Sequence, residues 1–566
     1  MPADELKYAP PGPGCWELDG THFPRPVTRF HAEIFGAAMT AGFSPALRRY
    51  GSLLESLEYA FVNGLAYSCP RPVGAPKGAK GPPPKLVFKL LTWLHPEVRR
   101  RLATVATVFE RKPWREELER WDREVKPASV RAHLALQAID PARLSADELL
   151  AHLERCREQV RASITQHHSF NLPCLLPVGD YVAHATRFTG LPIGAVLQLL
   201  QGASPASAGV SDELTGVVPA LRASSEARAL LASRTAPAQV LAQLRALPGE
   251  AGAAVERYVE RVGYRLIDGF DIGQPYALEV PEVLLNAIRG AIDDDGSAAR
   301  RCAQRREQIT AAVRAQVKEA DRPTFDALLA EARLVYRLRD ERGLYSELWT
   351  SGIARRAVLE AGARLVAAGK LPAAALFAEA SWDEMKALHA GTGGPEASEL
   401  AERARDRATR SVADAPPALG PGPSAPPPFE WLPPAAARAE LAVFTVIQAM
   451  LKEPVCKKEP KVARGLPVSA GTYEGIARLV TGPEDFGRLQ PGDVLVTRST
   501  SAAFNIILPL LGGIVTDRGG ALSHAAIVAR EYGIPGVVGC RDATTLIPDG
   551  ARVRVDGEAG EARVLA

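Results

Sequence analysis

The sequence predicts a multidomain protein in which a large, mostly α-helical region precedes a small C-terminal α/β domain. Apolar residues recur at helical spacing from residue 86 to about 410, as in DELLAHLERCREQVRASI at 147–164. Nine prolines crowd the 24 residues of 411–434. Short β-like runs appear only after about residue 463. A chain of 566 residues has room for three or four domains, or for one large domain and a small one.

The amino-terminal part is expected to be an arm followed by a helix. Residues 1–30 hold several prolines and show no apolar period, so we predict an irregular segment there. Residues 31–62 are typical of a helix that ends near Asn63-Gly64. Pro and Gly then separate further helices up to about residue 410.

A connector follows the helical region. Its proline-rich part, 411–434, should be extended and semi-stiff without a regular element. A short helix is predicted over 435–452, and a second polar stretch leads to residue 462. The predicted domains are therefore 1–410, a linker at 411–462, and 463–566. A small domain on such a tether can move between partners.

The last hundred residues have the pattern of a compact α/β domain. Strands are predicted in GDVLVTR (492–498), GGIVTD (512–517) and GVVG (536–539), and a hairpin in 551–565 that turns around Gly557–Gly560. Helical SHAAIVAREYG (523–533) lies between the second and third of these runs.

Composition excludes several classes of protein. The 68 basic and 65 acidic residues nearly cancel, which argues against a dedicated nucleic-acid binder. The seven cysteines are scattered and none forms a CxxC pair, so neither a disulfide framework nor a zinc ribbon is indicated. No signal-like N-terminus or long apolar run is present, so we expect no membrane partner and a cytoplasmic location.

One histidine stands where a strand turns into a helix, in TDRGGALSHAAIVAREYGIPGVVG at 516–539. Ser523 suits a helix N-cap, so His524 falls in the first helical turn. Unpaired N–H groups and the positive end of the helix dipole lie there. A cationic ring is disfavoured at that position, and we expect the pKa of His524 to be lowered. A neutral imidazole is a nucleophile, and phosphate on it would face the N–H donors.

The residues around His524 are the predicted phosphate-binding set, namely Thr516, Arg518, Gly519, Gly520, Ser523 and Arg530. The glycines allow unusual backbone conformations and close approach. No metal is expected at His524, because no Cys, Asp or second His accompanies it at ligand spacing. On these residues alone, a histidine that caps or packs at a helix start remains the commoner interpretation.

The motif T-x-x-G-G-x-x-S-H-A-A-I-x-A-R followed by G-I-P closely resembles the active-site signature of the phosphoenolpyruvate-utilising enzymes. The resemblance extends upstream through VSAGTYEGIARLV (468–480) and covers about 105 residues. It implies a mobile β/β/α swivelling domain whose histidine, His524, accepts phosphate and carries it to a second site. The run RSTSAAFN (498–505) departs from the Thr-x-P-x-W-like run of many relatives.

The helical region resembles the acceptor-binding domain of rifampin-phosphotransferase-like proteins. The matching stretches are 258–285, 338–371 and 375–388, in the order found in those proteins. The substrate-binding candidates there are Arg265, Asp268, Asp271, Arg339, Arg342, Arg356, His167 and His168. Salt-bridged turns, surface ion pairs and solvated histidines are the structural alternatives for these residues.

The same resemblance implies an ATP-grasp domain that loads the histidine, and the sequence shows neither its pattern nor a G-x-x-x-x-G-K-[ST] loop. The phosphoenolpyruvate-binding barrel of other members is not seen either. We therefore expect a split ATP-dependent phosphotransferase, with ATP and Mg²⁺ at a separate ATP-grasp partner and a small-molecule acceptor at this chain.

Three alternative functions stay open. They are a non-catalytic binding or regulatory protein, a condensing enzyme that forms an acyl phosphate, and a metal-dependent hydrolase using His167 and His168.

Overall fold

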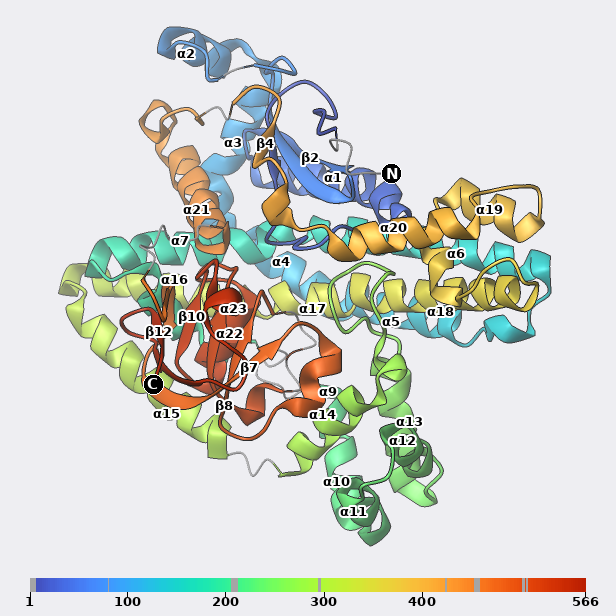
Figure 1. Cartoon of the computed structure of the whole chain (residues 1–566). Coiled ribbons are helices and arrows are strands. Elements are labelled where there is room, and N and C mark those ends of the chain that lie inside the picture. Colours follow the sequence, from blue (N-terminus) through green and yellow to red (C-terminus); the bar gives the residue numbers. More distant parts are fainter. Residues whose placement is uncertain are drawn as a thin grey trace. The chain divides into compact units, whose positions relative to one another are not determined.

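The computed structural model describes residues 7–79, 81–204, 212–293, 297–422, 425–451, 459–500, 504 and 507–565. Packing divides the chain into two compact units (Figure 1). The first comprises residues 1–174, 269–274 and 342–441, and the second comprises 175–268, 275–341 and 442–566. The predicted fold class is confirmed, since helices dominate and a sheet-containing domain closes the chain. The domain boundaries at 410 and 462 stay predictions, because the two units follow packing alone.

Long helices form most of the first unit. Its helices are α1 (Arg29–Tyr50), α2 (Lys85–Leu94), α3 (Pro96–Arg111), α4 (Pro113–Arg120), α5 (Lys126–Gln137), α6 (Ala146–Ser169), α18 (Glu347–Ala367), α19 (Trp382–Ala390) and α20 (Ala397–Thr409). Three helices cross the division between the units, namely α7 (Asn171–Thr189), α17 (Leu338–Leu344) and α21 (Pro434–Leu451). No helix in the described part of the chain is long and apolar enough to cross a membrane.

A four-stranded antiparallel sheet in the first unit corrects two predictions, the helix over 31–62 and the irregular segment over 1–30, which contains strand β1. Its strands lie in the order β2 (Leu54–Val62), β3 (Leu65–Pro72), β1 (Trp16–Leu18), β4 (Ala418–Leu419). The helix predicted to residue 62 ends at Tyr50, because Gly51 takes a left-handed conformation with φ 72° and caps it. Asn63 and Gly64 both have positive φ and join Val62 to Leu65 as a two-residue hairpin turn. The Asn-Gly pair was a hairpin signal and not the end of a helix.

The connector is also more regular than expected. The prediction that 411–434 contains no regular element is wrong at β4, which pairs with β1 through Glu17 and Ala418. A strand of two residues needs few backbone donors, so the flanking prolines do not prevent it. The predicted helix at 435–452 is confirmed as α21.

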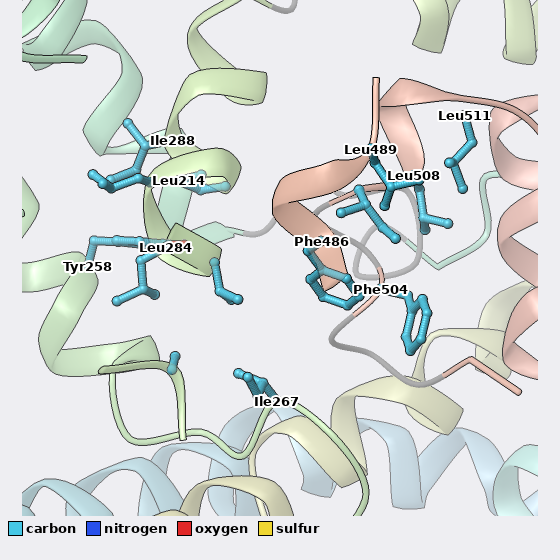
Figure 2. Close-up of a cluster of buried hydrophobic side chains, with 14 of the residues drawn as sticks. Leu214, Tyr258, Ile267, Leu284, Ile288, Phe486, Leu489, Phe504, Leu508 and Leu511 are labelled. Carbon is cyan, nitrogen blue, oxygen red and sulfur yellow. The ribbon is translucent and has the colours of Figure 1, made fainter. Parts of the chain in front are cut away.

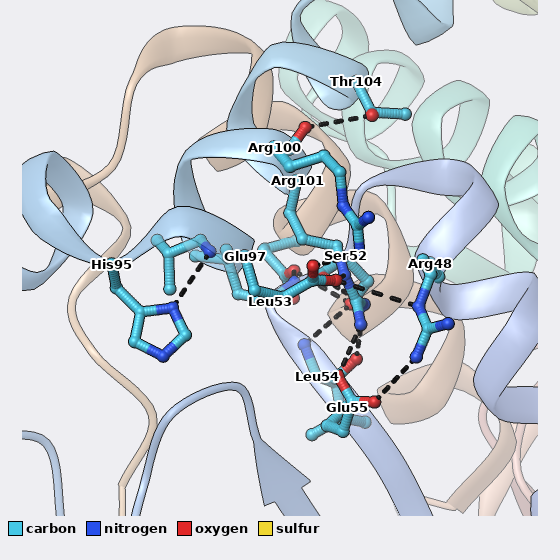
Figure 3. Close-up of polar contacts among 12 residues, drawn as sticks. Arg48, Ser52, Leu53, Leu54, Glu55, His95, Glu97, Arg100, Arg101 and Thr104 are labelled. Carbon is cyan, nitrogen blue, oxygen red and sulfur yellow. Dashed lines mark hydrogen bonds and ion pairs between the residues drawn. The ribbon is translucent and has the colours of Figure 1, made fainter.

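A buried arginine joins α3 to the segment between α1 and β2 (Figure 3). The Arg101 side chain is 1% exposed. It donates to the carbonyl oxygens of Ser52 at 2.8 Å and Leu54 at 3.1 Å, and to the carboxylates of Glu55 and Glu97. All three nitrogens of this guanidinium thus donate hydrogen bonds, two of them to carboxylates, which lets its charge lie in the interior.

The second unit combines a helical part with the C-terminal sheet. Its helices are α8 (Ile193–Leu197), α9 (Asp212–Thr215), α10 (Val217–Ala223), α11 (Ser225–Ala232), α12 (Pro237–Arg245), α13 (Gly249–Val262), α14 (Pro281–Asp293), α15 (Ser297–Gln316), α16 (Arg322–Tyr336), α22 (His524–Tyr532) and α23 (Ala543–Leu546). The core of this unit runs from α10, α13 and α14 to Phe486, Phe504 and Leu508 near the sheet (Figure 2). The C-terminal domain is thus packed on the helical part of its own unit.

The C-terminal sheet has eight strands in the order β5-β12-β11-β7-β8-β9-β10-β6. These are β5 (Val462–Arg464), β6 (Leu466–Ser469), β7 (Thr472–Val480), β8 (Asp493–Thr497), β9 (Leu511–Thr516), β10 (Gly536–Val538), β11 (Arg552–Asp556) and β12 (Glu561–Val564). Strands β7, β8, β9 and β10 are parallel neighbours. The predicted strands at 492–498, 512–517 and 536–539 are confirmed, as is the hairpin with Asp556 paired to Glu561. Residue 524 therefore lies at the carboxyl end of a central parallel strand.

Gly42 tests the packing of α1 on α6. A Cβ at Gly42 would lie 2.1 Å from the carbonyl oxygen of Thr165, which belongs to α6 backbone and cannot rotate away. We expect Gly42→Ala to destabilise the first unit by about 2–3 kcal/mol. Gly290→Ala in α14 is the matched control, because nothing lies within 4 Å of its added Cβ. That control should stabilise by about 0.5–1 kcal/mol. Calorimetric melting of both variants measures the difference, and equal melting would contradict the close packing.

Candidate active site

The loop between β9 and α22 presents His524 at the start of a capped helix. Ser523 is extended, with φ −65° and ψ 161°, and its side chain accepts a hydrogen bond from the N–H of Ala526 at 3.3 Å. Gly533, with φ 64°, ends the helix. The predicted N-cap is confirmed, and His524 is the first residue of α22.

The imidazole of His524 is held by a neighbouring hydroxyl. Its Nδ1 lies 2.9 Å from Oγ1 of Thr500, which follows β8. Desolvation lowers the pKa of His524 to about 4. The charge of Asp340 acts in the opposite direction, and the charge of Arg339 lowers the pKa further. The predicted direction of the shift is confirmed, with desolvation as its largest cause.

Two residues of α17 supply the charges around the ring. Arg339 donates from Nη2 to the carbonyl oxygen of Leu522 at 2.6 Å. Its Nη1 is buried and makes no hydrogen bond. Asp340 accepts a hydrogen bond from the hydroxyl of Ser204 at 2.6 Å. A guanidinium nitrogen without a partner beside a neutral imidazole suits an incoming anion.

The glycine pair serves close packing against the end of α21. A Cβ at Gly520 would lie 2.4 Å from the carbonyl oxygen of Ala449 and 2.6 Å from that of Met450. Leu522 donates its N–H to the same Ala449 oxygen at 3.0 Å. Gly519 has φ 120°, and a Cβ there would lie 2.7 Å from Oγ of Ser523. Contacts within the protein therefore require both glycines, whether or not a phosphate binds at this turn.

The other predicted phosphate-binding residues have structural partners. Thr516 is buried, and its hydroxyl donates to the carbonyl oxygen of Arg518 at 2.8 Å. Arg530 is 4% exposed and donates to the carbonyl oxygens of Val468 and Ala521. These bonds hold the turn that presents His524. Contact of Thr516, Arg518 or Arg530 with phosphate stays a prediction.

The candidate triad of Arg265, Asp268 and Asp271 is divided between the units. Arg265 and Asp268 belong to the second unit, where Arg265 pairs with Glu213 at 2.6 Å. Asp271 belongs to the first unit and accepts hydrogen bonds from the N–H and the hydroxyl of Thr28. The ion pair and the capped turn agree with the structural alternative for these residues, and their binding of an acceptor stays a prediction.

The three candidate arginines also differ in environment. Arg339 lies beside His524, as described above. Arg342 belongs to the first unit and donates to Oδ1 of Asn171 and to the carbonyl oxygen of His167. Arg356 donates to the carbonyl oxygen of Gln137 and pairs with Asp140. His167 and His168 end α6 and face Glu347, the first residue of α18.

Sequence reasoning missed Thr500 and Glu347 as site residues. Thr500 lies in RSTSAAFN, the run where the sequence departs from its relatives, and that departure was the available signal. Glu347 lies within a stretch singled out only for its arginines. Its 2% exposed carboxylate depends on the packing of α18, which no local pattern reveals.

Comparison with protein families agrees with this geometry. Residues 489–560 match the family model of the mobile domain of PEP-utilising enzymes. The resemblance predicted from the histidine motif is confirmed over these residues of the second unit. Residues 183–340 match the fourth domain of rifampicin phosphotransferase, so the layout is similar to that of the rifampicin phosphotransferases.

Curated relatives share different lengths of the chain. A rifampicin phosphotransferase of Bacillus cereus is 48% identical over 101 residues, which are 18% of this chain and 12% of that protein. A rifampicin phosphotransferase of a Streptomyces species is 30% identical over 351 residues, covering 58% of this chain and 36% of that protein. The prodigiosin synthesizing transferase PigC of Serratia marcescens is 40% identical over 121 residues, or 21% and 14% of the two chains. The chain thus spans about a third or less of the length of these relatives.

The charges on α17 give a test of the site. Since the charge of Arg339 lowers the pKa of His524, Arg339→Ala should raise it above the value of about 4. Asp340→Asn should lower it further, because the charge of Asp340 raises that pKa. Histidine NMR over pH 3–8, with the His524 signal assigned by loss in His524→Ala, measures both shifts. A ring that titrates near its ordinary value of about 6.5 would contradict the geometry.

Proposed function

We propose that this chain is the acceptor-binding and phosphohistidine-carrier component of an ATP-dependent phosphotransferase that acts on a small molecule. The observation that carries the proposal is a neutral imidazole at the start of α22, with Nδ1 on Thr500 and an unpartnered nitrogen of Arg339 nearby. The similarity of residues 489–560 to the mobile domain of PEP-utilising enzymes supports it.

The contact with Thr500 allows a tautomer in which Nε2 of His524 is the nucleophile, and we propose that this tautomer reacts. When Nδ1–H donates to Oγ1 of Thr500, Nε2 keeps its lone pair and can attack phosphorus. The P–N bond then forms at Nε2 as the phosphate donor's P–O bond breaks. In the second step an acceptor oxygen attacks phosphorus, and Nε2 leaves with its electron pair as neutral imidazole. Such transfer depends mainly on positioning and charge stabilisation, which Arg339 is placed to supply.

The phosphate donor is proposed to act at a separate protein. The sequence shows no ATP-grasp pattern and no Walker-type phosphate loop. We propose that ATP and Mg²⁺ act at a separate ATP-grasp partner in the cytoplasm, where Mg²⁺ would neutralise the transferring phosphates. The acceptor is proposed to be a small molecule bound by the helical part of this chain, in accord with the names of the relatives.

A second candidate is the activation of a carboxylate for condensation. Here the same phosphohistidine would form an acyl phosphate that a second substrate attacks. The similarity of 121 residues to the prodigiosin synthesizing transferase PigC favours this variant over a non-catalytic binding protein. Both candidates need His524 as carrier and differ in the product released.

Phosphorylation of His524 is the deciding test. Incubation with ATP, Mg²⁺ and a host lysate should add one acid-labile phosphoryl group to the intact chain. His524→Ala should abolish the gain. Thr500→Val should slow it about 10–100-fold, since losing a hydrogen bond at the ring costs about 1–3 kcal/mol. Intact-protein mass spectrometry over time measures all three.

A matched histidine controls for indirect effects. His389→Ala on α19 removes a histidine of the first unit that contacts the carbonyl oxygen of Ala146, and it should leave the gain unchanged. Equal phosphate labelling of wild type and His524→Ala would contradict the proposal that His524 is the carrier. Labelling without a phosphorylated small molecule, but with a condensed product, would favour the second candidate.

A further inference from the structure

Three polar atoms of the first unit converge without a hydrogen bond between them. Oε1 of Glu347 lies 3.4 Å from Nδ1 of His167 and 3.7 Å from Nε2 of His168. Ligand atoms of the three residues lie within 4.8 Å of one another, and Nδ1 of His167, Nε2 of His168 and Oε1 of Glu347 have no hydrogen-bond partner. Buried polar atoms are rarely left unsatisfied, so a group that is bound between them would explain the arrangement.

The cluster is built by two helix ends and lies among aromatic rings. His167 and His168 close α6, and Glu347 opens α18. The carboxylate is 2% exposed, while the histidine side chains are 12% and 13% exposed. Phe35 packs edge-on against His168, and Phe270 against His167. The atoms of the cluster are therefore enclosed, although a part of each histidine ring is exposed.

A hydrogen-bond network fixes the protons on His168. Arg342 donates to Oδ1 of Asn171, so the amide must turn Nδ2 toward Nδ1 of His168, 3.2 Å away. Nδ1 of His168 is then the acceptor, and its Nε2 carries the hydrogen. That N–H points at the gap beside Glu347.

One oxygen atom could form hydrogen bonds to all three polar atoms of the cluster. For three atoms separated by 3.4 Å, 3.7 Å and at most 4.8 Å, an oxygen can lie about 2.8 Å from each, at ordinary hydrogen-bond distance. A hydroxyl there would accept from Nε2–H of His168 and donate to Glu347. Water or the hydroxyl of a ligand satisfies this description.

A metal ion fits these three polar atoms less well than a hydroxyl does. A ligating Nε2 has no hydrogen, whereas the network with Asn171 places the hydrogen of His168 at Nε2. The Arg342 guanidinium also lowers the pKa of both histidines, as a nearby positive charge does, and would repel a divalent cation. The donor set thus favours a hydroxyl over a metal.

We propose that His168 and Glu347 bind a hydroxyl of the small-molecule acceptor, and that Glu347 takes its proton during phosphoryl transfer. This rests on the proposed function. The hydroxyl O–H bond breaks as the oxygen forms the P–O bond, the P–N bond to His524 breaks toward the imidazole, and the proton ends on Glu347. His167 donates or accepts at the same oxygen, and Asn171 and Arg342 are positioning residues. The acceptor class is an alcohol or phenol with an apolar body.

The ionisation of Glu347 determines how the rate of the proposed phosphoryl transfer depends on pH. Burial raises the pKa of Glu347 to about 8, and the charge of Arg342 opposes that rise. Burial, Arg342 and His22 lower the pKa of both histidines, which are uncharged at neutral pH. Glu347 becomes a base as the pH rises through about 8, so transfer should accelerate with pH up to that value.

Infrared spectroscopy tests the proton site without any substrate. The difference spectrum between wild type and Glu347→Gln should show a protonated carboxyl at pH 6 that is lost as the pH rises through about 8. Glu360→Gln on the same helix is the matched control, since Glu360 pairs with Arg364. A Glu347 that is already ionised at pH 6 would overturn the proton site.

Single-turnover discharge tests the use of that site. Wild type and variants are loaded at His524 with ATP, Mg²⁺ and host lysate, desalted, and chased with the small-molecule extract of the host. Glu347→Gln should load normally and discharge about 100-fold or more slowly, and Glu347→Asp should be intermediate. Glu360→Gln should match wild type. The wild-type discharge rate should rise with pH as Glu347 ionises, and this rise should be absent in Glu347→Gln.

The outcomes separate the two proposals. Normal loading with wild-type discharge in Glu347→Gln overturns the role of Glu347 and leaves the carrier intact. If the wild-type protein does not become phosphorylated at His524, the proposed function is overturned. The proposed role of Glu347 is then overturned as well, because it rests on that function. Stoichiometric Co²⁺ binding with a tetrahedral absorption band, lost in His168→Gln, would overturn the hydroxyl site in favour of a metal site.

Discussion

An imidazole attacks phosphorus only while it is uncharged, and this requirement constrains the whole surroundings of His524. Desolvation lowers its pKa to about 4, so the ring stays neutral at any physiological pH. The same desolvation would make a phosphorylated ring costly to hold unless its charge had a partner. In the proposed carrier, the unpartnered nitrogen of Arg339 and the N–H groups at the start of α22 would be such partners. The same arrangement would then keep the free ring neutral and bind the phosphorylated ring.

The backbone around His524 is fixed by packing that only glycine permits. Gly520 touches two carbonyl oxygens at the end of α21, and Arg530 is buried to hold two more carbonyls near the same turn. A turn held on both sides keeps the ring in place while phosphorus arrives and leaves. A loose turn would lose the orientation on which transfer depends. The glycines of this motif are thus explained by the geometry of the turn alone.

The C-terminal domain could be predicted from sequence because its signals are local. Alternating runs, the Ser523 cap and the Gly557–Gly560 turn each lie within a few residues of the element they specify. The N-terminal sheet could not, because β1 and β4 are 3 and 2 residues long and pair across about four hundred positions of sequence. Asn63-Gly64 was the exception, a local hairpin signal that helical propensity upstream obscured. The sequence could not tell which of the candidate arginines lie near His524. In the structure Arg339 bonds the carbonyl oxygen of Leu522, close to His524, whereas Arg265 and Arg356 form ion pairs with carboxylates.

Histidine has opposite tasks in the two units, and its surroundings decide which. At His524 a hydroxyl contacts Nδ1 and can accept its hydrogen, and the proposed carrier then uses the lone pair at Nε2 to attack phosphorus. At His168 an amide N–H contacts Nδ1, so Nε2 carries hydrogen and becomes a donor. The amide at His168 thus fixes Nε2 as a hydrogen-bond donor, whereas the hydroxyl at His524 permits Nε2 to be a nucleophile. A transfer from nitrogen to a hydroxyl oxygen needs both functions, since the attacking oxygen must be oriented and must lose its proton. In the two proposals, His524 is the nucleophile, and His168 with Glu347 orients and deprotonates the hydroxyl.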